Sequence, residues 1–83
     1  MRRLDATGLT CPLPVLKVRK ALKAMVEGDR LEVLTTDPMS VVDLPVFCAQ
    51  AGHRLVSEER LGDQFRLVIE CGGASDATPI ASR

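Results

Sequence analysis

One stretch decides the fold of this chain: residues 11–28, which read CPLPVLKVRKALKAMVEG. At about 100° per residue, its apolar side chains fall in one arc of a helix. The members of that arc are Val15, Val18, Ala21, Leu22, Met25 and Val26. Pro12 suits the first helical position, where a missing N–H costs nothing, and Gly28 suits a C-terminal cap. The stretch therefore predicts an amphipathic helix that begins at Pro12 and is capped by Gly28.

Strand patterns lie on both sides of this helix. Residues 2–6 read as a short strand, and residues 30–36 as an aliphatic strand ended by Asp37-Pro38. Residues 53–60 and 64–71 pair as a hairpin around Leu61-Gly62-Asp63. The last strand turns alternate side chains inward, and these are Phe65, Leu67, Ile69 and Cys71.

A second helix is predicted to start late, after an irregular turn over residues 38–42. Asp43 is a reasonable N-cap, Pro45 lies just inside, and Gly52 can end the helix. The element order is then βαβαββ. It predicts an α/β two-layer sandwich, with one four-stranded mixed sheet and two helices on one face.

Length and composition limit the class of protein. A chain of 83 residues is one domain at most, too small for a large enclosed pocket. We expect residues 1–71 to form this domain and residues 72–83, which are small and polar, to form a disordered tail. Two aromatic residues, both Phe, leave an aliphatic core.

Charge and cysteine content suggest a cytoplasmic protein. The net charge is +0, although residues 1–26 carry six basic side chains and one acidic one. This predicts a basic surface on the first helix, without a net field towards nucleic acid or a membrane. No apolar run is long enough to span a bilayer. The cysteines number three and form no C-x-x-C, so we expect free thiols and no metal site.

Cys11 is the candidate reactive residue. It lies beside the first turn of the predicted helix, where unpaired N–H groups and the helix dipole favour a thiolate. Pro12 and Pro14 stiffen the turn and leave the N–H of Leu13 as the nearest donor to the sulfur. Basic residues on the helix add a positive field, so we expect an anionic sulfur. In the competing interpretation, Cys11 is only a small apolar residue at a helix end.

The residues around Cys11 restrict its chemistry. A hydrolytic cysteine enzyme needs a base, and His53, the only histidine, has no spacing that pairs it with Cys11. A dithiol oxidoreductase needs a resolving cysteine, and position 14 is Pro14. What remains is a thiol that accepts a group and passes it on. Persulfide is a fitting cargo, because it forms and leaves by thiolate attack on sulfur.

Three motifs resemble the TusA (SirA-like) sulfur-carrier family. They are Leu4–Pro14 (LDATGLTCPLP), which contains the C-P-x-P element, Asp37-Pro38, and Asp43–Cys48 (DLPVFC). The resemblance covers about residues 3–71. It implies a cytoplasmic sulfurtransferase in the sense of a persulfide carrier, with no cofactor other than the covalent persulfide on Cys11.

The resemblance also implies partners. A cysteine desulfurase or similar donor would supply the sulfur. An acceptor protein would receive it in a relay for tRNA thiolation, molybdenum-cofactor enzymes or sulfur oxidation. Some members, including those of the tRNA relay, have an acidic residue where this chain has Leu13, which leaves the acceptor open. We expect a monomer that contacts neither membrane nor nucleic acid directly.

The predicted helix also suggests where a partner docks. Leu13 and Leu16 fall outside the buried arc, on the side of Lys17 and Lys20, and would suit an acidic partner surface. Both leucines would otherwise be ordinary surface residues.

The other two cysteines have simpler explanations. Cys48 is expected to be a buried small residue on the second helix, and Cys71 to pack in the core or at a strand end. His53 is expected at the surface, and Asp5 at a strand-end turn.

Three other functions stay open from the sequence. Gly72-Gly73 is the element that a ubiquitin-like sulfur carrier uses, but such a carrier needs it at the chain end. A nucleic-acid-binding or regulatory module would use the basic helix, yet that helix has no aromatic residue to stack on bases. In a pure protein-interaction domain, Cys11 would be replaceable.

Overall fold

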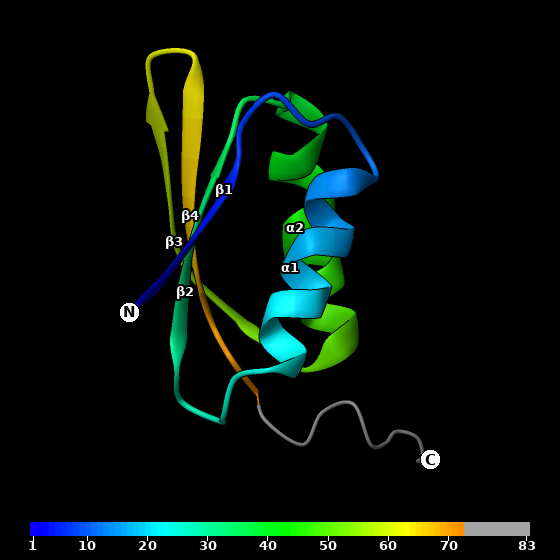
Figure 1. Ribbon diagram of the computed structural model, residues 1–83, viewed down its shortest axis with the longest axis vertical. Helices are drawn as coiled ribbons and strands as arrows, with labels where there is room; N and C mark the ends of the chain where they lie inside the picture. The colour runs from blue at the N-terminus through cyan, green and yellow to red at the C-terminus, as the bar shows by residue number, and fades with distance from the viewer. Residues whose placement is uncertain (73–83) are drawn as a thin grey trace.

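The computed structural model describes residues 1–72 and forms two layers (Figure 1). One layer is a four-stranded sheet, and the other is a pair of helices on one face of it. The elements in chain order are β1 (Arg2–Ala6), α1 (Leu13–Lys23), β2 (Arg30–Thr35), α2 (Pro38–Ala51), β3 (Arg54–Leu61) and β4 (Gln64–Glu70). The predicted βαβαββ sandwich is confirmed. The predicted tail lies, apart from Gly72, outside the described residues.

The sheet is mixed, with the strand order β1-β2-β4-β3. β1 pairs with β2 in parallel, and Leu4 lies opposite Val33. β2 and β3 each pair antiparallel with β4. The parallel pair needs a crossover connection, which α1 supplies. This connection brings the end of β1, the start of α1 and the start of α2 to one end of the molecule (Figure 1).

The core lies between the sheet and the helices. It is aliphatic, as composition predicted, and its most deeply buried large side chains include Val18, Leu31, Val33, Leu44, Leu67 and Ile69. The predicted inward face of β4 is confirmed. Val68, on the outward face of β4, is also only 5% exposed, because β4 lies between β2 and β3.

α1 ends earlier than the sequence predicts. Its last residue is Lys23, and the N–H of Ala24 donates to the carbonyl of Ala21. Gly28 is therefore not its cap. With a φ of 93°, which favours glycine, Gly28 forms the turn into β2, and its N–H donates to the carbonyl of Cys71. Val26, predicted to be buried, is 66% exposed because it follows the end of the helix.

α2 begins earlier than predicted, at Pro38 rather than after Asp43. The side chain of Asp37 is the cap and accepts from the N–H of Met39 at 3.2 Å. Pro45 lies inside the helix and removes one backbone hydrogen bond. Burial of Leu44 and Cys48 against the sheet, at 0% and 2% exposure, outweighs that loss. Gly52 ends the helix, as predicted, in a left-handed conformation.

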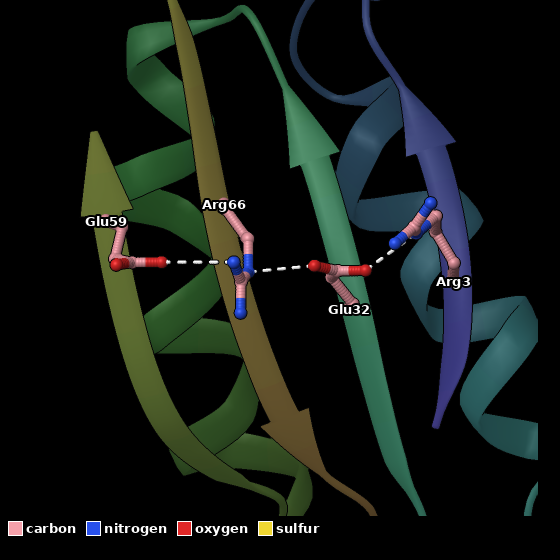
Figure 2. A network of polar contacts seen from close by, with 4 residues as sticks. All are labelled: Arg3, Glu32, Glu59 and Arg66. Carbon is pink, nitrogen blue, oxygen red and sulfur yellow. Dashed lines mark hydrogen bonds and ion pairs between the residues drawn. The ribbon is translucent and has the colours of Figure 1, made fainter. Parts of the chain in front are cut away.

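The sheet face away from the helices carries a row of alternating charges across all four strands (Figure 2). Arg3 Nε and Arg66 Nε lie 2.7 and 2.8 Å from the two carboxylate oxygens of Glu32, and Arg66 continues to Glu59 at 3.4 Å. The hydrogen bond from Arg3 lowers the pKa of Glu32, and the charges of both arginines act in the same direction. Charged side chains thus line the sheet face opposite the main apolar core.

No helix within residues 1–72 is long and apolar enough to cross a membrane.

Candidate functional site

Cys11 is exposed and lies in the loop between β1 and α1. Its backbone N–H donates to Asp37 Oδ2 at 2.8 Å. The same carboxyl group caps α2 through its other oxygen. A second contact ties the loop to the start of α2, since the N–H of Gly8 donates to Thr36 Oγ1 at 2.9 Å. The position of Cys11 is therefore fixed by the chain segment that leads into the second helix.

The thiol of Cys11 has a partner on α2. Its sulfur donates to Asp43 Oδ2 at 3.0 Å. Asp43 is half-buried and lies inside α2, so its side chain is not used as a cap. Sequence reasoning missed this contact because it made Asp43 the cap of a later helix. The Asp43-Leu44-Pro45 motif was the available signal, but it was interpreted as a helix start.

The predicted anionic sulfur is contradicted by this geometry. The hydrogen bond to Asp43 raises the pKa of the Cys11 thiol above its ordinary value, and desolvation and the negative charges of Asp43 and Asp37 act in the same direction. The N–H of Leu13, expected to face the sulfur, donates to the carbonyl of Thr10 at 2.9 Å. The two carboxylates thus counteract the helix N-terminus and favour the neutral thiol.

The remaining predicted site residues follow Cys11 along the chain into α1. Pro12 precedes the helix as its N-cap residue, and Pro14 is buried in the first turn. Leu13 and Leu16 are 47% and 49% exposed. Lys17 and Lys20, on the same helix, are exposed as well.

α2 adds an apolar surface that the sequence did not predict. Met39, Val42 and Val46 are each more than half exposed. Met39 and Val46 stand four residues before and three after Asp43, so they flank it on the helix surface. Exposed apolar side chains thus flank the residue that contacts the thiol of Cys11.

The other two cysteines face the core. Cys48 is 2% exposed, and burial raises its thiol pKa to about 11. Cys71 is equally buried, and its thiol donates to the carbonyl of Leu22 at 3.6 Å. Both agree with the predicted packing roles.

His53 lies at the C-terminal end of α2, far along the helix from Asp43. It is half-buried rather than a surface residue, because its Nδ1 accepts from the N–H of Gly72 at 2.9 Å and its ring packs on Phe47. A groove of about 380 Å³ between the C-terminal ends of the helices includes His53 and does not include Cys11. Within the described residues, no cluster of side chains could hold a metal ion.

Comparison with known proteins identifies a family whose model this chain matches and several similar proteins. The family model described as "Sulfurtransferase TusA" matches residues 2–71. The "Sulfur carrier protein TusA" of Allochromatium vinosum is 44% identical over 69 residues, which cover 83% of this chain and 91% of the relative. A "putative sulfur carrier protein" of Neisseria meningitidis serogroup A is 46% identical over 67 residues, covering 81% and 90% of the two chains.

A solved structure has the same architecture. The crystal structure of a SirA-like protein from Desulfitobacterium hafniense superposes with a TM-score of 0.77 at 28% identity. The match covers 87% of this chain and 99% of the other. The order of strands and helices described above is thus the fold of that protein.

Proposed function

The chain belongs to the TusA family of sulfur carriers, and on that premise we propose that Cys11 accepts persulfide sulfur from a cysteine desulfurase or similar donor and passes it to an acceptor protein. One observation supports this choice of residue above the others: Cys11 is exposed, whereas Cys48 and Cys71 are each 2% exposed. A sulfur atom moves by thiolate attack, so both proteins must reach the carrier sulfur directly. Only the exposed thiol meets that requirement.

The proposed chemistry has two exchanges of the same kind. In loading, the Cys11 thiol loses its proton to water, and the resulting thiolate attacks the terminal sulfur of the donor persulfide. The new S–S bond forms on Cys11, the donor S–S bond breaks, and the donor cysteine leaves as a thiolate. In unloading, an acceptor thiolate attacks the terminal sulfur on Cys11. Each exchange is redox-neutral overall and needs no cofactor. On the carrier, the S–S bond on Cys11 forms in loading and breaks in unloading.

Intact mass spectrometry tests this proposal. The reduced protein is incubated with a cysteine desulfurase and cysteine, and the wild type is compared with Cys11→Ser and with Cys48→Ala as the matched control. We expect a gain of one sulfur atom on the wild type and on Cys48→Ala, and none on Cys11→Ser. An adduct that persists in Cys11→Ser would move the chemistry to another cysteine.

The surface around Cys11 supports a docking proposal. Leu13 and Leu16 are half-exposed beside Lys17 and Lys20, and this pattern suits a partner with an apolar centre and an acidic rim. The acceptor would belong to a relay such as those for tRNA thiolation, molybdenum-cofactor enzymes or sulfur oxidation. Leu13, next to the reactive segment, would contact whichever acceptor it is.

Charge reversal tests the docking proposal. We expect Lys17→Glu with Lys20→Glu to slow sulfur transfer from the desulfurase by about tenfold at low salt, and less at high salt. Arg2→Glu, at the far end of β1, is the control with a charge reversal outside the surface. Equal transfer rates for the double variant and the control would refute docking on this face.

A further inference from the structure

The hydrogen bond from the Cys11 sulfur to Asp43 can form when Cys11 is a free thiol but not when it carries a persulfide. As a thiol, Cys11 carries a hydrogen that its sulfur donates to Asp43 Oδ2 at 3.0 Å. As a persulfide, the same sulfur is bonded to a second sulfur and has no hydrogen to donate. Loading therefore removes one charge-assisted hydrogen bond and leaves the carboxylate facing sulfur lone pairs.

The surroundings of Asp43 strengthen this difference. Asp43 is half-buried on α2, so water screens its carboxylate less than it would on an open surface. Asp37, on the same side of Cys11, holds the backbone N–H at 2.8 Å and adds a second negative charge. A persulfide that ionises would place its negative charge beside both carboxylates. The acidic groups facing this sulfur thus favour the unloaded thiol over an ionised persulfide.

We propose that Asp43 biases the carrier towards release, by favouring Cys11 as a free thiol over Cys11 as a persulfide. This inference rests on the proposed function and concerns how tightly Cys11 holds the transferred sulfur. A carrier that held sulfur too well would stop at loading. At equilibrium, the carboxylate therefore shifts sulfur from Cys11 towards an acceptor thiol, because the released Cys11 sulfur takes up a proton and donates a hydrogen bond to Asp43.

The bias acts on unloading, in which one S–S bond forms and one breaks. An acceptor thiolate attacks the terminal sulfur on Cys11, and a new S–S bond forms on the acceptor. The S–S bond on Cys11 breaks, and its electron pair stays with the Cys11 sulfur. That sulfur takes a proton from water and donates it in a hydrogen bond to Asp43. No oxidant or reductant takes part.

An exchange equilibrium tests the bias without a partner protein. Wild type, Asp43→Asn and Asp63→Asn are equilibrated in one mixture of glutathione and glutathione persulfide, and intact mass gives the ratio of loaded to unloaded protein. Asp63 is the control because it is exposed in the β3–β4 turn and its loss changes the net charge equally. We expect Asp43→Asn to raise the ratio on the order of tenfold, with Asp63→Asn matching the wild type.

A second readout separates charge from structure. The rate of alkylation of Cys11 is measured against pH in each protein. Because Asp43 raises the thiol pKa, Asp43→Asn should move this profile to lower pH, and Asp43→Glu should keep it close to the wild type. Loss of packing alone would not move the profile in one direction and restore it with glutamate. Asp43→Ser, also uncharged, supplies the same reading if the amide disturbs α2.

The outcomes distinguish the two levels of the proposal. Wild type that takes up no sulfur on Cys11 would overturn the proposed function. Wild type and Asp43→Asn that load equally on Cys11 would overturn the bias and leave the carrier function standing. A higher loaded ratio in Asp43→Asn, with an unshifted Asp63→Asn, supports both.

Discussion

Cys11 and Cys48 have the same altered property for different reasons. Both thiols have a raised pKa, but Asp43 raises that of Cys11, whereas burial raises that of Cys48 to about 11. A hydrogen-bond partner can be removed by one substitution or displaced when another protein docks. Burial can be relieved only by opening the fold. The comparison teaches that access, rather than acidity, separates a reactive thiol from a structural one in this molecule.

The largest expected effect concerns access itself. In the folded protein, we expect iodoacetamide to alkylate Cys11 at least about 100-fold faster than Cys48, because Cys48 reacts only after the fold opens. Peptide mapping of partly labelled protein measures the two rates. In denaturant the rates should converge. Comparable labelling of both residues in the native protein would remove the basis of the comparison.

Serine substitution should separate the two residues by stability. Cys48→Ser places a hydroxyl in an apolar core, and we expect it to lower the free energy of unfolding by about 1 to 3 kcal/mol. Cys11→Ser should change it by less than about 0.5 kcal/mol, since residue 11 is exposed and serine can also donate to Asp43. Urea denaturation followed by circular dichroism measures both values. The reverse order would mean that Cys11, not Cys48, is structural.

A smaller effect is expected from alkaline pH. The unfolded thiol of Cys48 ionises near 9.0 and the folded one near 11, so between these values the unfolded chain binds fewer protons than the folded one. The free energy of unfolding should therefore fall as pH rises through this range. In Cys48→Ala the decline should be shallower than in the wild type. Parallel declines in the two proteins would assign the effect to other groups.

The smallest expected effect comes from salt. Part of the influence of Asp43 and Asp37 on Cys11 acts through space, and salt screens it. Raising ionic strength from about 0.05 to about 1 M should lower the apparent pKa of Cys11. Ultraviolet absorbance of the thiolate in Cys48→Ala, with the Cys11→Ser, Cys48→Ala double variant as the blank, measures this change. A shift to higher pKa would argue that cations, not carboxylates, dominate around Cys11.

Local patterns predicted most of the fold. Apolar periodicity located the body of α1 and its buried face, and strand alternation located the inward side chains of β4. The order of elements was enough to predict the mixed sheet with both helices on one face. The end of α1 was misplaced because Gly28 is a plausible cap, and only the turn between α1 and β2 shows that it is used elsewhere.

The misplaced start of α2 had the larger consequence, because it hid the contact between Asp43 and Cys11. Asp37-Pro38 and Asp43-Leu44-Pro45 are competing start signals, and a proline inside a helix argues locally for the later one. The cap that Asp37 makes to the N–H of Met39 and the burial of Ser40 in the first turn decide for the earlier one. Asp43 is then free to bind the thiol of Cys11, at a sequence separation of 32 residues. A sequence pattern within one segment cannot reveal a contact between two residues so far apart in the chain.

The position of Cys11, beside the starts of both helices, has a consequence for how its sulfur would pass between proteins. If Cys11 carries sulfur as proposed, a donor and an acceptor must each reach this one exposed sulfur, so they exclude each other. Delivery would then be ping-pong: the carrier would leave one protein before it meets the next. Surplus donor would compete with the acceptor for the same face, and the cell's ratio of the two would set the throughput of the relay.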